Sequence, residues 1–335
     1  MTTVNVVAFE NGVGNSRDLA LVVRTLRDLG CTVSVASVSA SARRRRRSRI
    51  VAAVAALRRW AARRAWRRGA PAPFDYTLML EHVWPEALHA AARNIVVPNP
   101  EWFDRGDRRL LPRADVVWSK TAHSVEAFRR LGRDPTLIGF DSEDRYDPGV
   151  PRERAFFHLA GKSRMKGTQR LVEVWARHPE WPRLTVVHSR KAVFDVVAAP
   201  NISYLTRYLS DQELRDLQNR HRFHLCLSET EGWGHYIPEA LSVGAVVIAT
   251  DAAPMNEHVT AERGFLVACR AAGQQHLATT YAFDEAALER VVAEVLALGA
   301  PDLERIGGAA RRWFLENHAQ FGARIGAALA AAGAG

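Results

Sequence analysis

The sequence lacks the features of a secreted or membrane-spanning chain. It has only three cysteines, Cys31, Cys226 and Cys269, whose wide spacing predicts reduced core thiols rather than a disulfide framework or a zinc site. No run of 18 apolar residues occurs, and residues 1–10 lead straight into a strand-like segment instead of a secretory leader. We therefore expect a cytoplasmic protein without a transmembrane helix.

The chain is long enough for two domains. It has 335 residues, of which 47% are hydrophobic, so it can bury a sizeable core. Strand-like runs alternate with helical patterns in both halves, which predicts an α/β protein with two parallel-sheet, Rossmann-like domains. The predicted strands lie near residues 4–9, 32–37, 76–80, 94–97, 115–118 and 136–140, and then near 155–159, 184–188, 202–205, 223–227, 246–250 and 264–267.

A charged, turn-rich stretch at residues 141–151 marks the expected domain boundary. We place an N-terminal domain at residues 1–145 and a C-terminal domain at residues 152–315. The last helical pattern, from about residue 302 to 329, has no strand after it, so residues 316–335 are treated as a terminal helix.

Two glutamates flank a glycine-rich turn in the second half. Glu231 follows the predicted strand at 223–227, and Glu239 follows Pro238 in the first turn of a predicted helix. Ligands of open α/β sheets bind at this edge, where free N–H groups suit phosphate or sugar oxygens. The two carboxylates add acceptors for hydroxyl groups, which favours a ligand such as a sugar nucleotide. The alternative is one solvated acid and one acid stabilised by the helix dipole.

Three basic residues crowd an earlier strand-to-helix turn. Lys162, Arg164 and Lys166 lie between the predicted strand at 155–159 and a helix expected from about Thr168. Cations this close repel one another unless an anion lies among them, and a diphosphate is a good candidate. Taken alone, such a turn is more often a solvated loop.

The two motifs together resemble those of nucleotide-sugar glycosyltransferases with the GT-B fold, in particular the retaining family 4. The glutamates match the Glu-x7-Glu motif of that family, and Lys166 before Gly167 matches the lysine of its Gly-Arg…Lys-Gly pattern. The arginine of the pattern corresponds to Arg164, with Lys162 as the substitute because it directly follows Gly161.

The resemblance implies two domains facing each other across a cleft, with the terminal helix crossing back to the first domain. It implies that Glu239 holds the ribose of the donor and that Glu231 contacts hydroxyls of the donor sugar. Lys166 and Arg164 would stabilise the leaving diphosphate, so Glu231, Lys166 and Arg164 are the expected catalytic residues. The remaining expected donor-binding residues are Lys162, the backbone of Gly232, Trp233, Gly234 and His235, and the first-loop glycines Gly12 and Gly14.

The expected reaction moves a sugar from a UDP- or GDP-linked donor to a hydroxyl of a lipid-linked, saccharide or small-molecule acceptor. Retention follows from the resemblance alone. No Asp-x-Asp element is present, so we expect catalysis without a metal, and no cofactor is expected. The glycines of the first loop carry little weight by themselves, since a simple tight turn explains them equally well.

The acceptor side departs from the family pattern. Residues 114–121 resemble the element Asp-x-hydrophobic-hydrophobic-x-Ser, with Ser119 one residue closer to Asp115, but no histidine stands at the expected position ahead of it, which reads Val96-Val-Pro-Asn-Pro-Glu-Trp102. Asn99 and Glu101 are the candidates there, although two prolines also suit a rigid structural turn. His82, after another predicted strand, is a further candidate, and a lone histidine is more often structural.

The positive charge is concentrated in one segment. Residues 43–68 hold 12 arginines and no acid, while the whole chain has a formal net charge of +10. Arginine pairs with Trp60 and Trp66 among them predict a basic amphipathic helix that lies on an anionic membrane surface, such as the inner face of the plasma membrane. A polyanionic acceptor, adventitious nucleic-acid binding and a solvated or partly disordered insertion are the alternatives, and nucleic acid is not an expected physiological partner.

Two other classes of function compete with glycosyl transfer. A GT-B relative such as a sugar-nucleotide epimerase would consume the donor without an acceptor, and a phosphorylase would require a pyridoxal-phosphate lysine motif that we do not find. A non-enzymatic membrane-surface or nucleic-acid-binding protein would explain the arginines of residues 43–68. It would leave the paired motifs of the second half unexplained.

Overall fold

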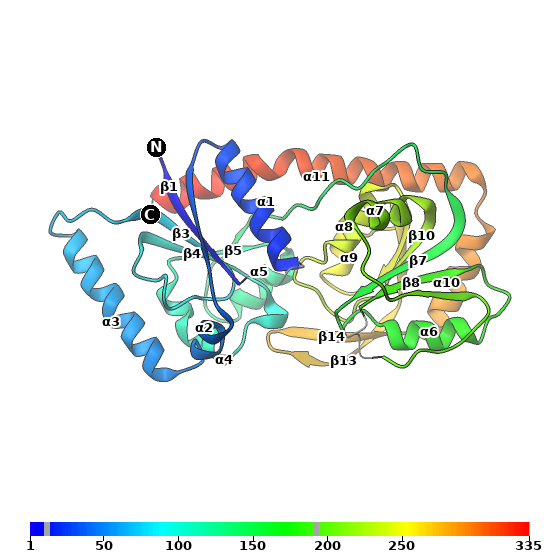
Figure 1. The fold of residues 1–335 in the computed structure, drawn as a ribbon, viewed down its shortest axis with the longest axis horizontal. Helices are drawn as coiled ribbons and strands as arrows, with labels where there is room; N and C mark the ends of the chain where they lie inside the picture. Colours follow the sequence, from blue (N-terminus) through cyan, green and yellow to red (C-terminus); the bar gives the residue numbers. More distant parts are fainter. Residues whose placement is uncertain (10–13, 190–193, 335) are drawn as a thin grey trace. The chain divides into compact units, whose positions relative to one another are not determined.

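The fold is described from a computed structural model, in which residues 1–9, 14–189 and 194–334 are described. The chain divides into two units (Figure 1). Unit 1 comprises Met1–Asp141, Gln275–Ala278 and Ala319–Gly335, and unit 2 comprises Ser142–Gln274 and Thr279–His318.

Unit 1 is built on a six-stranded parallel sheet in the order β2-β1-β3-β4-β5-β6. The strand order reverses between β1 and β3, which creates a crevice at their carboxyl ends. Side chains of the inner strands are mostly buried, as expected for parallel strands covered on both faces. The strands are β1 (Thr3–Ala8), β2 (Thr32–Ser37), β3 (Phe74–Glu81), β4 (Ala91–Pro98), β5 (Val116–Ser119) and β6 (Thr136–Leu137).

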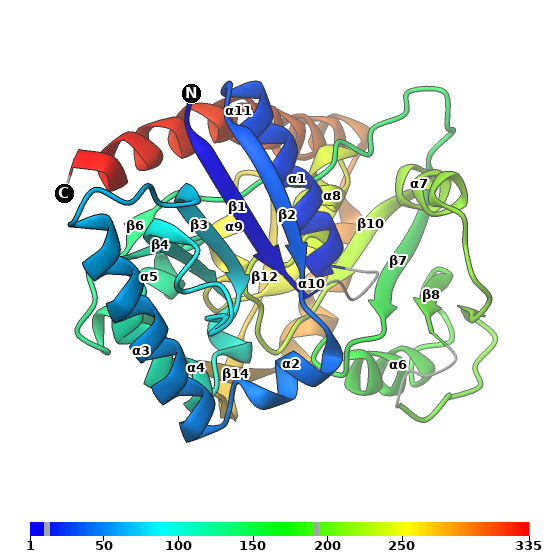
Figure 2. The ribbon, with the colours of Figure 1, turned by 60° about the vertical axis from the view of Figure 1, so that its left-hand side comes forward.

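Helices connect most of these strands, although β3 and β4 are joined by turns. Figure 2 shows α1 running beside β1 and β2. The core includes Trp84, and Phe103 contacts Phe128 edge-to-face with ring centroids 4.8 Å apart. The helices are α1 (Gly14–Asp28), α2 (Ala40–Arg45), α3 (Arg49–Trp66), η1 (Pro100–Trp102), α4 (Arg105–Leu110), η2 (Leu111–Arg113) and α5 (Ala122–Arg129).

Unit 2 repeats the parallel architecture, with strand order β12-β11-β10-β7-β8-β9. Its order reverses between β7 and β10, so the carboxyl ends of these neighbouring strands form its crevice. Phe156, Trp175 and Phe223 pack together in the core. The strands are β7 (Glu153–Gly161), β8 (Leu184–His188), β9 (Ile202–Leu205), β10 (His221–Cys226), β11 (Val246–Thr250) and β12 (Gly264–Val267), and the helices are α6 (Thr168–Ala176), α7 (Asp211–Arg220), α8 (Tyr236–Ser242), α9 (Met255–His258) and α10 (Glu285–Ala297).

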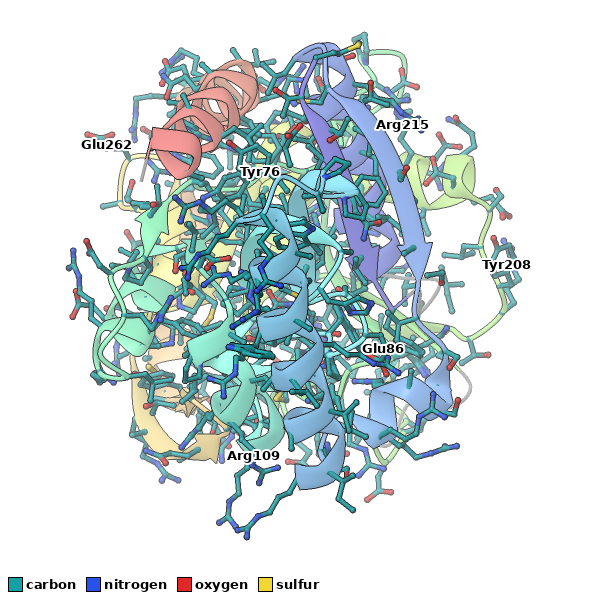
Figure 3. All side chains as sticks on the ribbon, turned by 90° about the vertical axis from the view of Figure 1, so that its left-hand side faces the viewer. Tyr76, Glu86, Arg109, Tyr208, Arg215 and Glu262 are labelled. Atoms are coloured by element: carbon teal, nitrogen blue, oxygen red, sulfur yellow. The ribbon has the colours of Figure 1, made fainter. Side chains whose placement is uncertain are left out.

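The last helix, α11 (Ala300–Ala334), contributes residues to both units. Within unit 1, Phe321 of α11 packs against Phe140 with ring centroids 5.3 Å apart. The hydroxyl of Tyr76 donates to the carbonyl oxygen of Leu329 at 3.3 Å, and Figure 3 labels Tyr76 beneath the helix. The helix end is thus fixed on unit 1 by an aromatic contact and a hydrogen bond.

Each predicted strand is observed, although β6 ends at Leu137 instead of residue 140, and the two parallel sheets are confirmed. The predicted bounds 32–37, 184–188, 202–205, 246–250 and 264–267 are those observed. A two-stranded sheet of β13 (Cys269–Gln275) and β14 (Ala278–Phe283) was not predicted. The side chains of β13 are largely exposed, small or polar, so this strand lacks the apolar alternation by which strands are recognised. Cys31 and Cys226 are buried as expected, whereas Cys269 of β13 is half-buried.

The arginine-rich segment forms two helices where the sequence predicted one. The hydroxyl of Ser39 accepts a hydrogen bond from Ala42 N, and that of Ser48 accepts one from Val51 N, so α2 and α3 each have their own N-cap. The break between the helices places Arg46 in the interior, where it is 2% exposed.

Part of the positive charge of this segment is neutralised inside unit 1. The guanidinium of Arg46 lies 2.9 Å from both Asp104 and Asp107. Arg59 of α3 is also buried and forms an ion pair with Asp115, while burial lowers the pKa of Arg59 against the opposing effect of that carboxylate. These arginines are structural, because a buried charge is tolerated only when it is paired.

Replacing Arg59 with Met should lower the free energy of unfolding of unit 1 by about 3 kcal/mol, because Asp115 would lose its buried partner. Arg58 is the matched control, since it is exposed on the same helix and its replacement with Met should change stability by less than about 0.5 kcal/mol. Urea unfolding followed by circular dichroism compares the two variants. Equal effects would contradict a structural role for Arg59.

Candidate functional site

The two motifs of the second half meet in unit 2. The basic turn follows β7 and the glutamate turn follows β10, and these strands are parallel neighbours, so their carboxyl ends lie side by side. The backbone N–H of Glu229 donates to Met165 O at 2.8 Å and joins the turns directly. At Gly167, where φ is +67°, a β-carbon would lie 2.3 Å from Leu227 O. Only glycine allows this approach without a shift of the backbone.

Lys166 and Glu231 form an ion pair across this junction. Their Nζ and Oε1 atoms are 2.5 Å apart, and both side chains retain about 15% exposure at most. The ammonium of Lys166 also lies 3.5 Å from the ring centroid of Tyr236, which adds a cation–π contact. The hydroxyl of Ser228 donates to the same Oε1 at 2.5 Å and lies 2.5 Å from the Tyr236 hydroxyl. A cation and a carboxylate are thus held together at a partly open position.

The glycine turn between the two glutamates is rigidly supported. Gly234 has φ +78°, and a β-carbon there would lie 3.0 Å from Cγ of Glu231. The indole of Trp233 points inward and donates to Ser142 Oγ at 3.0 Å, and the same oxygen lies 2.9 Å from Nδ1 of His235. The side chain of Trp233 is therefore committed to the interior of unit 2, which leaves the backbone of the turn to meet a ligand.

Buried histidines support both turns in their neutral form. Burial lowers the pKa of His158 to about 4, and its Nδ1–H donates to Leu225 O while Nε2 accepts from Thr168 at the start of α6. Burial also lowers the pKa of His258 to about 4, and its Nε2–H donates to Trp233 O at 2.8 Å. Neutral imidazoles fix these strand ends without adding charge beside Lys166.

Glu239 lies fully buried at the base of the site. Nε2 of Gln218 donates to its Oε2 at 3.0 Å, and Nε of Arg145 donates to Oε1 of Gln218, also at 3.0 Å. Because arginine can only donate, it fixes which end of the Gln218 amide faces Glu239. Nε2 of His224 further donates to Gln218 O at 2.9 Å. The orientation of the Glu239 carboxylate is therefore set by a chain of hydrogen bonds that begins at Arg145.

The remaining two cations of the basic turn lie at the surface. Lys162 and Arg164 are exposed, and neither forms an ion pair with another described residue. Gly161, which precedes them, has φ +59°, and a β-carbon added there would meet no atom within 4 Å. The structure thus brings Lys166, Glu231 and the glycine turn together and leaves Lys162 and Arg164 at the rim of the turn.

The acceptor-side candidates belong to unit 1. Asn99 caps η1 with its backbone, and its side-chain Oδ1 is buried without a hydrogen-bond partner. Glu101, in η1, is buried. His82 is 1% exposed; its Nδ1 lies 3.0 Å from Asp107 and its Nε2 lies 3.2 Å from Arg46. His82 is thus part of the ion-pair network of the α2–α3 junction.

The first loop is only partly described. Gly12 lies outside the described residues, and Gly14 is the first residue of α1. Asn15, next in α1, donates to Phe9 O at 3.2 Å and to Glu81 at 2.7 Å. Glu81 ends β3 with φ +65°, a strained value for a residue with a side chain. This hydrogen bond spans the point where the strand order of unit 1 reverses.

Three residues of the site were missed in the sequence. Ser228 and Tyr236 flank the glycine turn, and the available signal was that Tyr236 lies inside the Glu-x7-Glu motif and Ser228 just before it. Gln218 lies one helix upstream on α7, and no spacing rule connects it with Glu239. No group of three or more histidine, cysteine or acidic side chains suited to a metal occurs within residues 1–9, 14–189 and 194–334.

Comparisons with known proteins give matches in structure only. No protein-family model and no curated protein matches this chain. A glycosyltransferase from Rickettsia africae is similar to it, with 14% identity, coverage of 98% of this chain and 97% of that chain, and a TM-score of 0.69. HepE from Anabaena, solved with UDP and glucose, has 15% identity, coverage of 99% and 100%, and a TM-score of 0.66. The sucrose-phosphate synthase from Thermosynechococcus elongatus has 12% identity, coverage of 98% of both chains, and a TM-score of 0.68.

These likenesses establish the fold over the whole chain. Two six-stranded parallel sheets and nearly complete coverage of glycosyltransferase structures confirm the expected GT-B fold. Membership of the retaining family 4 stays a prediction.

Because Gly167 lies so close to Leu227, we expect substitution of this glycine to destabilise the protein more than substitution of Gly161. Gly167 and Gly161 both have φ near +60°, but only at Gly167 would a β-carbon collide with backbone. Replacing Gly161 with Ala should cost about 1–2 kcal/mol of stability from the left-handed conformation alone. Replacing Gly167 with Ala should cost clearly more, because the turn must also move away from Leu227. Thermal unfolding of both variants measures the difference, and equal losses would contradict the packing of the two turns.

Proposed function

We propose that this protein is a glycosyltransferase that moves a sugar from a nucleoside-diphosphate sugar to an acceptor hydroxyl. One observation supports this most. Lys166, Glu231 and the glycine turn lie together in unit 2, where the strand order of its sheet reverses, and the chain has a GT-B fold. A cation and a carboxylate beside the backbone of a glycine turn suit a ligand with both phosphate and hydroxyl groups.

Charge development gives each residue of the site a role. When the bond between the anomeric carbon and the phosphate oxygen breaks, the sugar becomes electron-poor and the nucleoside diphosphate gains negative charge. Lys166 and Arg164, with Lys162 at the rim, offset the charge of the diphosphate. Glu231 binds hydroxyls of the donor sugar and orients it. Glu231 also forms an ion pair with Lys166, which positions the cation.

Glu239 is the proposed acceptor of hydrogen bonds from the ribose. A ribose hydroxyl reaches this buried carboxylate only when neighbouring side chains move, because Glu239 has no exposed surface in this structure. The hydrogen bond from Gln218 keeps the Glu239 carboxylate in one orientation while those side chains move. Gln218 and Arg145 are therefore positioning residues for donor binding.

We propose a uridine nucleotide as the donor, since HepE from Anabaena was solved with UDP and with UDP-glucose. Retention at the anomeric carbon and catalysis without a metal are also proposed, from the motif resemblance and from the lack of an Asp-x-Asp element. None of the three structures named above is described as an epimerase, so nothing favours that alternative.

The class of acceptor and the cellular location of the protein are also proposed. We propose a lipid-linked, saccharide or small-molecule hydroxyl as acceptor, with Asn99 and Glu101 of unit 1 as candidate polar contacts. The unpartnered Oδ1 of Asn99 supports its candidacy, because a buried polar atom needs a donor. We also propose that the protein works in the cytoplasm at an anionic membrane surface, which it reaches through residues 43–68.

Thermal shift tests donor binding directly. UDP and a UDP-sugar at 100 times their Kd should stabilise the protein by about 2.7 kcal/mol, and EDTA should not reduce the shift if no metal is needed. GDP and GDP-sugars form the second arm. No stabilisation by any of these nucleotides would refute the proposal, whereas a shift with GDP alone would reassign the base.

Replacing Gln218 with Leu should raise the KM for the donor about 10-fold or more with a smaller change in kcat, because Glu239 loses a hydrogen bond that orients it. Gln212 is the matched control, since it is exposed on the same helix and donates a hydrogen bond to Asp216. Its replacement with Leu should leave both constants unchanged. An unchanged KM in the Gln218 variant would rule out the positioning role.

A further inference from the structure

The outward face of α3 is apolar, which reverses the usual orientation of an amphipathic helix. Ile50, Val54, Leu57 and Trp60 are 76%, 44%, 63% and 59% exposed. Their spacing of four, three and three residues places them on one side of the helix. In Figure 3, which faces α3, no other ribbon of unit 1 crosses in front of it. We call these four residues the apolar stripe.

The inward face of α3 explains this orientation. It buries Ala52, Ala55 and Arg59, so it consists of small side chains and one paired cation. The guanidinium of Arg59 donates to Leu88 O at 2.7 Å and pairs with Asp115. Turning the helix to bury the apolar stripe would pull Arg59 and Arg63 away from the partly buried Asp115 and leave its charge unpaired. The ion pair of Arg59 with Asp115 therefore keeps the apolar stripe exposed to solvent.

Exposed cations border the apolar stripe. Arg49, Arg58, Arg64 and Arg67 are all exposed, and residues 43–68 contain no acid. The guanidinium of Arg64 lies 5.6 Å from the ring centroid of Trp60. At the start of α3, Arg109 of α4, labelled in Figure 3, donates to Arg47 O at 2.9 Å and adds a further cation. The surface thus combines apolar side chains with positive charge on its borders.

We propose that α3 docks on an anionic lipid bilayer, with the apolar stripe inserted at the level of the acyl chains and the bordering arginines bound to lipid phosphates. Helices that lie in the membrane interface combine these two features, and tryptophan is common at that depth. Spanning is not implied, since none of the described helices is long and apolar enough to cross a bilayer. A symmetric dimer would place the arginines of one copy against those of the other, so a lipid surface fits better than a second copy.

Docking through the apolar stripe rests on the membrane attachment proposed above, and it assigns the contact with lipid to different residues of α3. The sequence predicted one basic amphipathic helix within residues 43–68, with Trp60 and Trp66 among its arginines. Arg46 and Arg59 are unavailable to lipid because they are paired inside unit 1. The apolar stripe instead makes attachment depend on apolar insertion as well as on charge.

Co-sedimentation of the full chain with vesicles tests this. Vesicles of equal parts phosphatidylcholine and phosphatidylglycerol should bind the protein, and phosphatidylcholine alone should bind it at least 10-fold more weakly. The double variant Leu57→Ser/Trp60→Ser and the double variant Arg58→Gln/Arg64→Gln should each lose at least 10-fold in affinity. The control Val196→Ser/Tyr208→Ser removes exposed apolar side chains of unit 2, which are 60% and 91% exposed, and should bind like the parent.

Three results would overturn the proposal: no binding to anionic vesicles, unchanged binding of the Leu57/Trp60 variant, or a solution dimer that this variant abolishes. As a second readout, brominated lipids should quench tryptophan emission in the parent and quench it less in Trp60→Phe; equal quenching would also overturn insertion. The assay contains no nucleotide, and donor-induced thermal shifts should be the same in all these variants. Failure of docking is therefore distinguishable from failure of the proposed transferase function.

Discussion

The site of unit 2 depends on the parallel pairing of β7 with β10. That pairing sets two strand-to-helix turns side by side, and the bond from Glu229 N to Met165 O and the glycine at 167 then draw them into contact. The ion pair of Lys166 and Glu231 forms only because the turns are this close. Residues 65 positions apart in sequence thereby become one site of mixed charge.

Charge pairing shapes unit 1 in a comparable way. Arg59 and Asp115 fix the rotation of α3, so that small residues face inward and large apolar residues face water. A helix of this composition would ordinarily bury its apolar side chains, since burial of each is worth about 1.5–3 kcal/mol. Keeping them exposed is consistent with a surface that binds a partner.

Much of the fold could be predicted because it rests on local patterns. Buried parallel strands are runs of apolar residues, and β8 and β11 were located to the residue for this reason. β13 was missed because its side chains are largely exposed, small or polar. The site was predicted in part: Glu231, Glu239 and Lys166 lie in recognisable motifs, whereas Gln218 approaches Glu239 from another helix.

The sequence by itself determined the order of strands and helices and the residue types of each turn, because these depend on neighbours along the chain. Tertiary structure alone decided that β7 lies beside β10, that the Gln218 amide faces Glu239, and that α3 turns Arg59 inward and Trp60 outward. These outcomes depend on the pairing of distant strands and of distant charges. The spacing of residues along the chain does not predict which strands or which charges pair, because the two members of each pair belong to different helices or strands.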